Sequence, residues 1–412
     1  MDSKSIFVLI VGILTFNYLL GRFLSYLNDT RRSTELPQEL EGIYDEGKYK
    51  KQQEYDKENS RFSMLTATFS FTIMLLMLLF DGFAWVDGLV TTMTDHAILA
   101  VLLFFGILGL ASDIIGIPFS LYGTFVIEEK YGFNRTTVKT FILDKLKGYL
   151  LGGLIGGGLL ALFVWFYDTA GDLFWVYAWS LFSGFALFMT AFYASIIVPL
   201  FNKLTPLESG SLREAIEDYC KKVNFKLNDL FVMDGSKRSA KANAFFSGLG
   251  AKKKIVLYDT LIENHTKEEL VAVLAHEAGH FKKKHTRSSL IISILQTGLM
   301  MYILSLVIGS PALSQALGVQ EQSFHIGLLV FSLLYSPLSM IMGIGMNMLS
   351  RKNEYEADAF ARDTYNGEAL ASALKKLSVD NLSNLTPHPF YVFLNYSHPT
   401  LLQRLNALKI AD

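Results

Sequence analysis

The chain has 412 residues and almost no net charge, with 37 Lys and Arg against 38 Asp and Glu. It is 51% hydrophobic and only 18% charged, and its mean hydropathy is positive. This composition excludes an ordinary soluble protein of this length and argues against a nucleic-acid-binding protein. The single cysteine, Cys220, excludes an internal disulfide, and we interpret it as a small buried hydrophobe.

Seven long apolar runs dominate the chain, each near the ~20 residues that cross a bilayer core. They span residues 5–27, 62–80, 97–117, 148–166, 174–200, 289–308 and 326–349. Buried helices of a soluble fold mimic one or two such runs but not seven, so we predict a mainly α, polytopic membrane protein. The first run lacks a basic start and an A-x-A cleavage site, which indicates a retained helix rather than a signal peptide.

Loop charges orient the predicted bundle. The connections at 81–96, 168–173 and 309–325 contain no Lys or Arg, whereas the alternate connections hold nearly all of them. Because positive loops stay in the cytoplasm, the amino terminus should lie outside and the carboxyl terminus inside. The glycines at 152–153 and 156–158 favour close helix packing in the fourth run.

A soluble insertion interrupts the apolar runs after the fifth. Its pattern predicts a helix at 211–223, short strands at 230–233, 242–246 and 254–258, and a helix at 267–284. In zinc peptidases a sheet edge beside the metal can bind an extended substrate by strand addition. Our candidate for that edge is Asn243, Ala244, Phe245 and Phe246. The expected division is 1–201 (five transmembrane helices), 202–287 (metallopeptidase insertion), 288–350 (two transmembrane helices) and 351–412 (carboxyl-terminal segment).

The insertion contains the motif HEAGH at 276–280. Two histidines at i and i+4, His276 and His280, project from one helix face and can bind zinc, while Glu277 can reach a water molecule. If 351–361 is helical, Glu354 and Asp358 share a face and Glu356 points away. Glu354 is then the third ligand, and Asp358 can orient a ligating imidazole. The alternative for this segment is an amphipathic helix whose charges face water.

The other histidines lack a metal-binding pattern. His285 lies five residues after His280, off the ligand face, so we expect at most an interfacial or supporting role. We interpret four further histidines as structural: His96, His265, His325 and His388.

HEAGH followed by E-x-x-x-D resembles the CAAX prenyl proteases of the integral-membrane zinc-metallopeptidase type, the a-factor-converting enzyme family. Further similar segments are YGFNR (131–135), DGSKRS (234–239), KIVLYDTL (254–261) and YSHPTLLQRL (396–405). The resemblance implies seven helices enclosing a chamber under a small α+β metallopeptidase domain with one Zn²⁺. It also implies that Asn243 lies near the substrate, that His398 stabilises the tetrahedral intermediate and that Arg404 lies nearby. Without the resemblance, Asn243 is a turn residue and His398 a loop residue.

These residues predict peptide hydrolysis, with Glu277 as general base and zinc held by His276, His280 and Glu354. The resemblance implies CAAX processing, the removal of the last three residues after a prenylated cysteine. One alternative is a quality-control protease with no prenyl requirement. The other is a transporter with structural zinc, for which Asp113 in the third run is the only strong candidate.

The expected partners are the lipid bilayer and peptide or protein substrates, with or without a prenyl group; the oligomeric state is left open. The chain ends without an endoplasmic-reticulum retention signal. That favours a bacterial inner membrane over the endoplasmic reticulum membrane of a eukaryote. The active site is expected on the cytoplasmic side in either case.

Overall fold

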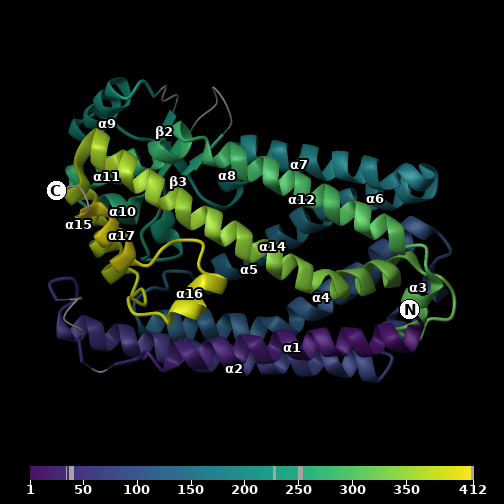
Figure 1. Ribbon diagram of the computed structural model, residues 1–412. Helices are drawn as coiled ribbons and strands as arrows, with labels where there is room; N and C mark the ends of the chain where they lie inside the picture. Colours follow the sequence, from purple (N-terminus) through teal and green to yellow (C-terminus); the bar gives the residue numbers. More distant parts are fainter. Residues whose placement is uncertain (34, 37–40, 226–228, 249–253, 410–412) are drawn as a thin grey trace.

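The computed structural model describes residues 1–33, 35–36, 41–225, 229–248 and 254–409. Within these residues seven helical segments are long and apolar enough to cross a membrane, which confirms the predicted polytopic, mainly α fold (Figure 1). The segments are α1 (Ser3–Asp29), α2 (Glu46–Leu79), α4 (Ala97–Tyr122) with η2 (Gly123–Glu128), α5 (Val138–Leu151) with η3 (Gly152–Gly156) and α6 (Gly157–Thr169), η4 (Gly171–Leu173) with α7 (Phe174–Ile196) and α8 (Val198–Phe201), α12 (His285–Val307), and α14 (Phe324–Ala361).

The connections without Lys or Arg gather at one end of the bundle, beside the amino terminus (Figure 1). Two of them contain short helices that were expected as loops, α3 (Gly82–Met93) and α13 (Pro311–Gln315). Apolar residues of α3 pack into a core shared with α1, α4 and α14. In the same region His325 Nε2 lies 2.6 Å from Asp87 Oδ1, and both side chains are buried. His325 therefore has the structural role expected of it.

The glycine-rich stretch of the fourth span forms a π-helical turn, η3. A Cβ atom built on Gly152, Gly153, Gly156 or Gly158 would meet no heavy atom within 4 Å. The prediction that these glycines permit close helix packing is therefore wrong. Only Gly157 approaches a neighbour, with Leu102 Cδ2 at 3.9 Å from its ideal Cβ position.

The opposite end of the molecule carries a four-stranded sheet. Its strands are β1 (Leu204–Pro206), β2 (Asp229–Met233), β3 (Ala244–Ser247) and β4 (Lys254–Tyr258), in the order β1-β2-β4-β3. β2 and β4 are parallel and the other pairs are antiparallel. The three predicted strands are confirmed, the second of them two residues later than expected at its start. β1 was not predicted, because three residues that end in proline give no strand pattern.

Further helices complete the part of the chain outside the membrane spans. They are η5 (Gly235–Lys237), α9 (Ser211–Lys222), α10 (Asp259–Asn264), α11 (Lys267–Lys282), η6 (Arg362–Asn366), α15 (Gly367–Asp380), α16 (Pro389–Asn395) and α17 (Leu401–Lys409). The core joins α9, α11, β4 and α15 through buried Ile216, Leu257, Leu274 and Leu370. Cys220 lies in this core as expected, and burial raises the pKa of its thiol to about 11. A thiol so buried is a poor nucleophile at neutral pH.

α11 is fixed at its amino-terminal end by a buried glutamate. Thr266 and Glu269 form a capping box, in which each side chain accepts a hydrogen bond from the other's backbone N–H. Glu269 is only 4% exposed, and it also accepts hydrogen bonds from Ser372 Oγ (2.6 Å) and Lys376 Nζ (2.8 Å) of α15. Burial opposes ionisation, yet these donors hold the pKa of Glu269 at about 2, below its usual 4.5.

Glu269→Gln should therefore lower the free energy of unfolding at pH 7 by about 2–3 kcal/mol. The folded pKa is depressed, so this stabilisation is complete above pH 4.5 and is lost as the pH falls from 4.5 toward 2. Thermal unfolding in detergent between pH 3 and 7 measures the effect. The matched control is Glu268→Gln, because Glu268 is the exposed neighbour. Equal melting temperatures for the two variants at pH 7 would contradict the assignment.

Candidate active site

Two helices meet at the HEAGH motif. α14 is a single helix from the seventh span to Ala361, so the same rod crosses the membrane and carries Glu354. It passes α11 so closely that a Cβ on Gly279 would lie 3.0 Å from the Cα of Ala357. Glycine at this position of the motif is thus required by the helix crossing, and it lets Glu354 reach the two histidines.

The three predicted ligands converge on one point. His276 Nε2 lies 3.2 Å from His280 Nε2 and 3.5 Å from Glu354 Oε2, and His280 Nε2 lies 3.2 Å from Glu354 Oε1. Zn–N bonds of about 2.0–2.1 Å in a tetrahedron place ligand atoms about 3.3–3.4 Å apart. The observed separations are therefore those of three corners around a zinc-sized ion.

The chemistry of these side chains also fits a metal. Glu354 is buried, and its Oε2 makes no well-aligned hydrogen bond to a described residue, although Arg404 Nη1 lies 3.5 Å and His398 Nδ1 3.1 Å away. A buried carboxylate oxygen surrounded by such positive or ligating groups is suited to bind a cation. Two imidazoles and one carboxylate form a donor set suited to zinc, and three protein ligands leave a position for water or substrate, as in catalytic sites.

A second group of charges lies beneath the ligands. His276 Nδ1 lies 2.8 Å from Asp358 Oδ1, as the one-turn spacing from Glu354 predicted. Arg404 of α17 donates two hydrogen bonds to Asp358, at 2.8 and 2.6 Å, and its Nη1 lies 3.5 Å from Glu354 Oε2. Arg404 is itself largely buried. It contacts the carboxylates behind the metal site, and this geometry favours a positioning role over substrate contact.

Glu277 faces a cavity of about 850 Å³ on the open side of the site. Burial raises the pKa of its carboxyl group, and the neighbouring His276 and His280 only partly oppose this. A carboxylate with a raised pKa is a better proton acceptor near neutral pH. The cavity is also lined by His280, by residues of α7 and by Ala244, Phe245 and Phe246 of β3.

β3 is an edge strand, since its one neighbour among the described strands is β4. Its free edge is therefore available to pair with an extended peptide. Asn243 immediately precedes it and is exposed; its Oδ1 accepts a hydrogen bond from Ala244 N (2.8 Å), and its carbonyl accepts one from Tyr258 N (3.1 Å). The second bond extends the β3–β4 pairing by one residue, so Asn243 lies at the start of the edge strand with its side chain exposed.

His398 lies in the segment between α16 and α17. Its side chain is 63% exposed, and its Nδ1 lies 3.1 Å from Glu354 Oε2. The structure thus brings His398 to the metal site from a segment more than 100 residues after HEAGH. Because most of this imidazole is exposed at the metal site, it can contact a bound peptide.

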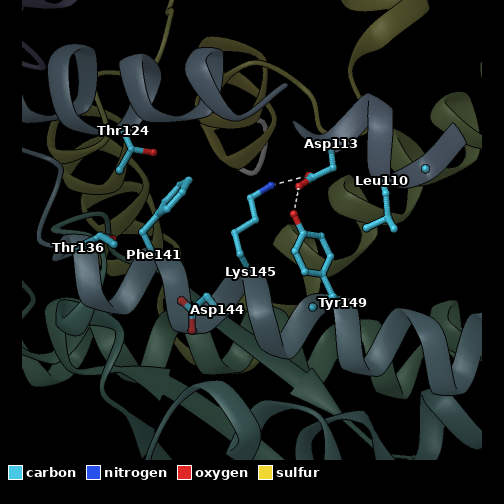
Figure 2. Close-up of a pocket in the computed structure, with 10 residues that line it drawn as sticks. Leu110, Asp113, Thr124, Thr136, Phe141, Asp144, Lys145 and Tyr149 are labelled. Carbon is cyan, nitrogen blue, oxygen red and sulfur yellow. Dashed lines mark hydrogen bonds and ion pairs between the residues drawn. The ribbon is translucent and has the colours of Figure 1, made fainter. Parts of the chain in front are cut away.

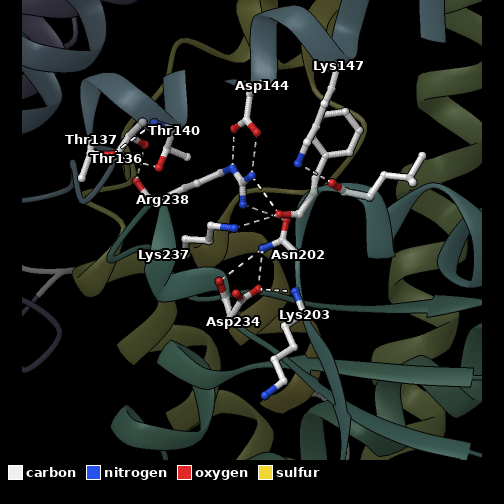
Figure 3. A network of polar contacts seen from close by, with 12 residues as sticks. Thr136, Thr137, Thr140, Asp144, Lys147, Asn202, Lys203, Asp234, Lys237 and Arg238 are labelled. Carbon is white, nitrogen blue, oxygen red and sulfur yellow. Dashed lines mark hydrogen bonds and ion pairs between the residues drawn. The ribbon is translucent and has the colours of Figure 1, made fainter. Parts of the chain in front are cut away.

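A polar joint connects the sheet to the membrane helices (Figure 3). Arg238 donates two hydrogen bonds to Asp144 of α5, at 2.7 and 2.9 Å, and others to Asn202 Oδ1 and Phe201 O. Asn134 forms a β-bridge with Ser239, so the sequence segments 131–135 and 234–239 lie side by side. The joint ends at Ser239, four residues before Asn243. Both segments were noted in the sequence as similar to the family. Their contact was not predicted, because it joins residues about a hundred positions apart.

Arg238→Ala should lower the free energy of unfolding by about 1.5–3 kcal/mol, because it removes charge-assisted hydrogen bonds. The double variant with Asp144→Ala should cost less than the sum of the two single variants, since they share one interaction. Thermal unfolding measures both. Lys139→Ala, at an exposed position of α5, is the control and should melt like the parent protein; additive losses in the double variant would argue against the joint.

Asp113, the residue on which the transporter alternative depends, is already paired. Its carboxylate contacts Lys145 Nζ (2.5 Å) and the Tyr149 hydroxyl (2.5 Å) across a cavity between α4 and α5 (Figure 2). An ion pair with a hydrogen-bonded tyrosine satisfies a membrane carboxylate without a transported ion. The feature that would favour transport is therefore explained by helix packing.

Comparisons with known proteins agree with this geometry. Residues 26–203 match the family model described as "CAAX prenyl protease N-terminal, five membrane helices", and residues 206–411 match peptidase family M48. The chain belongs to the M48 peptidase family. It is 40% identical to the probable CAAX prenyl protease 1 of Schizosaccharomyces pombe, over 88% of this chain and 80% of that protein. It is 34% identical to the Homo sapiens homologue, over 97% and 94%.

The crystal structure of S. mikatae Ste24p superposes with a TM-score of 0.93 at 32% identity, covering 98% of this chain and 99% of that one. The family resemblance found in the sequence is thus confirmed, as is the fold of seven helices enclosing a chamber with a small metallopeptidase domain. The chain is an integral-membrane metalloendopeptidase, as M48 membership and the convergent His276, His280 and Glu354 indicate.

Proposed function

We propose that this enzyme is a zinc endopeptidase that removes the last three residues after a prenylated cysteine. The observation that carries the proposal is a single cavity that joins Glu277 and His280 to the free edge of β3. An extended peptide paired with that edge would lie across the three convergent ligands. The CAAX substrate class is supported by the names of the relatives in Schizosaccharomyces pombe and Homo sapiens.

One Zn²⁺ per chain would be held by His276, His280 and Glu354. When bound, zinc lowers the pKa of a water molecule toward ~7 and polarises the scissile carbonyl. Glu277 accepts a proton from water and returns it to the leaving amine, a role that its raised pKa supports. Asp358 holds His276 in one tautomer through Nδ1.

Other residues align the substrate and the ligands. Asn243 and the backbone of Ala244, Phe245 and Phe246 bind the peptide as an added strand. His398, exposed at the rim, donates a hydrogen bond to the oxygen that becomes negative as the carbonyl is attacked. Arg404 contacts the carboxylates of Asp358 and Glu354 and holds them in position.

The basic loops lie at the end that carries the metal site, which supports a cytoplasmic active site. Protease accessibility of tags placed at the two termini, in sealed vesicles, tests this orientation. Localisation in a bacterial inner membrane, rather than in the endoplasmic reticulum, stays a prediction. Fractionation of the source cells tests it.

The decisive experiment compares a farnesylated CAAX peptide with the same peptide unprenylated, using the purified full chain. The expected result is release of the terminal tripeptide, faster by at least about tenfold for the prenylated peptide, lost with a chelator and restored by zinc. Equal rates for both peptides would favour the quality-control alternative. No cleavage of either peptide in the zinc-loaded protein would overturn the proposed activity.

A further inference from the structure

His280 has a neighbour that its sequence spacing hides. α11 ends at Lys282, and Lys284 adopts a left-handed conformation with φ of 63°, which turns the chain directly into α12. His285 is the first residue of α12 and is buried. The turn places His285 Nδ1 3.0 Å from His280 Nδ1, although five residues along one helix would put the two rings on different faces.

His285 in turn contacts α14. Its Nε2 lies 3.1 Å from Glu356 Oε2. Glu356, which was expected to point away from the ligand face of α14, is therefore linked to His280 through His285. Glu356 is partly exposed, and its other charged partner is Lys352, at 3.8 Å on the same helix. A continuous chain therefore runs from Glu354 through His280 and His285 to Glu356.

The proton positions along this chain follow from hydrogen-bonding rules. A histidine that binds a metal through Nε2 keeps its proton on Nδ1, so His280 must donate from Nδ1. His285 Nδ1 is the acceptor, and the one proton of a neutral His285 then sits on Nε2. That proton is donated to Glu356, whose carboxylate is acceptor-only when ionised. Each atom in the chain has one role that is consistent with its neighbours.

We propose that His285 and Glu356 form a positioning pair, which fixes the tautomer and ring orientation of His280 for metal binding. His276 is held by a carboxylate directly, through Asp358, whereas His280 is held by a carboxylate acting through a second imidazole. Partners of this kind orient a ligand and raise its basicity, and their loss weakens metal affinity by about 10- to 100-fold. The inference rests on the proposed metal site but not on the CAAX substrate.

The test measures Zn²⁺ affinity of the full-length protein in detergent by competition with a chelator, with no activity assay. Glu356→Ala should weaken binding by about 10- to 100-fold, and His285→Phe by at least as much. Glu356→Gln should stay within a few-fold of the parent protein, because its amide oxygen still accepts the His285 Nε2 proton. Lys352→Ala, which removes only the lysine partner of Glu356, should bind zinc like the parent protein.

Co²⁺ substitution supplies a second readout. The visible absorption bands of bound Co²⁺ should shift in Glu356→Ala and remain parental in Glu356→Gln, as expected if His280 changes orientation. Because Glu356 is partly exposed, its variants keep the test valid even if His285→Phe does not fold. Parental affinity and spectra in Glu356→Ala would overturn the positioning role. His280→Ala separates the two proposals: if it also binds zinc like the parent protein, the metal site itself is wrong.

Discussion

Glu277→Gln is expected to keep its zinc and to lose between about 100- and 10,000-fold of the hydrolysis rate. Glutamine has nearly the same shape but cannot accept a proton from water. The ligands His276, His280 and Glu354 are untouched, so the metal content should equal that of the parent protein. Single-turnover cleavage of the farnesylated peptide and metal analysis of the same preparation measure the two quantities.

The control for this substitution is Glu268→Gln, which makes the same change on the exposed side of α11. It should cleave at the parental rate. If Glu277→Gln also cleaved at that rate, Glu277 would not be the general base. If it lost both zinc and activity, Glu277 would instead support the metal site.

Arg404→Met should lower the free energy of unfolding by about 3–5 kcal/mol. The Arg404 side chain is 12% exposed and Asp358 is 1% exposed, so removal of the guanidinium leaves a buried carboxylate without its two-pronged partner. Glu354 also loses a nearby positive charge. A large fall in the melting temperature of the purified protein is the expected observation.

Arg404→Lys is the informative comparison, because lysine keeps the charge but lacks the planar fork that matches a carboxylate. It should recover only part of the loss. The double variant Asp358→Asn with Arg404→Met should lose less than the sum of the single variants, as expected for one shared interaction. A lysine variant as stable as the parent protein would show that charge alone, rather than the fork, holds Asp358.

Local patterns in the chain were enough to predict the membrane helices and the three residues that converge at the candidate metal site. A bilayer requires long apolar runs, so each span appears as a continuous segment of sequence. The i, i+4 spacing of His276 and His280, and that of Glu354 and Asp358, is a property of one helix and needs no tertiary information. The short elements β1 and α3 were missed because their few residues carry no periodic signal and are stabilised by packing against neighbours.

The sequence by itself therefore determined the class of protein, the likeness to a family of membrane zinc peptidases and the residue types at the candidate metal site. Only the tertiary structure decided which supporting charges meet which ligand. Arg404 reaches Asp358 from 46 positions away, and Arg238 reaches Asp144 from 94. His285 contacts His280 because Lys284 turns the chain between two helices. Such contacts depend on helix crossings and turns between distant segments, and helical periodicity describes only one element at a time.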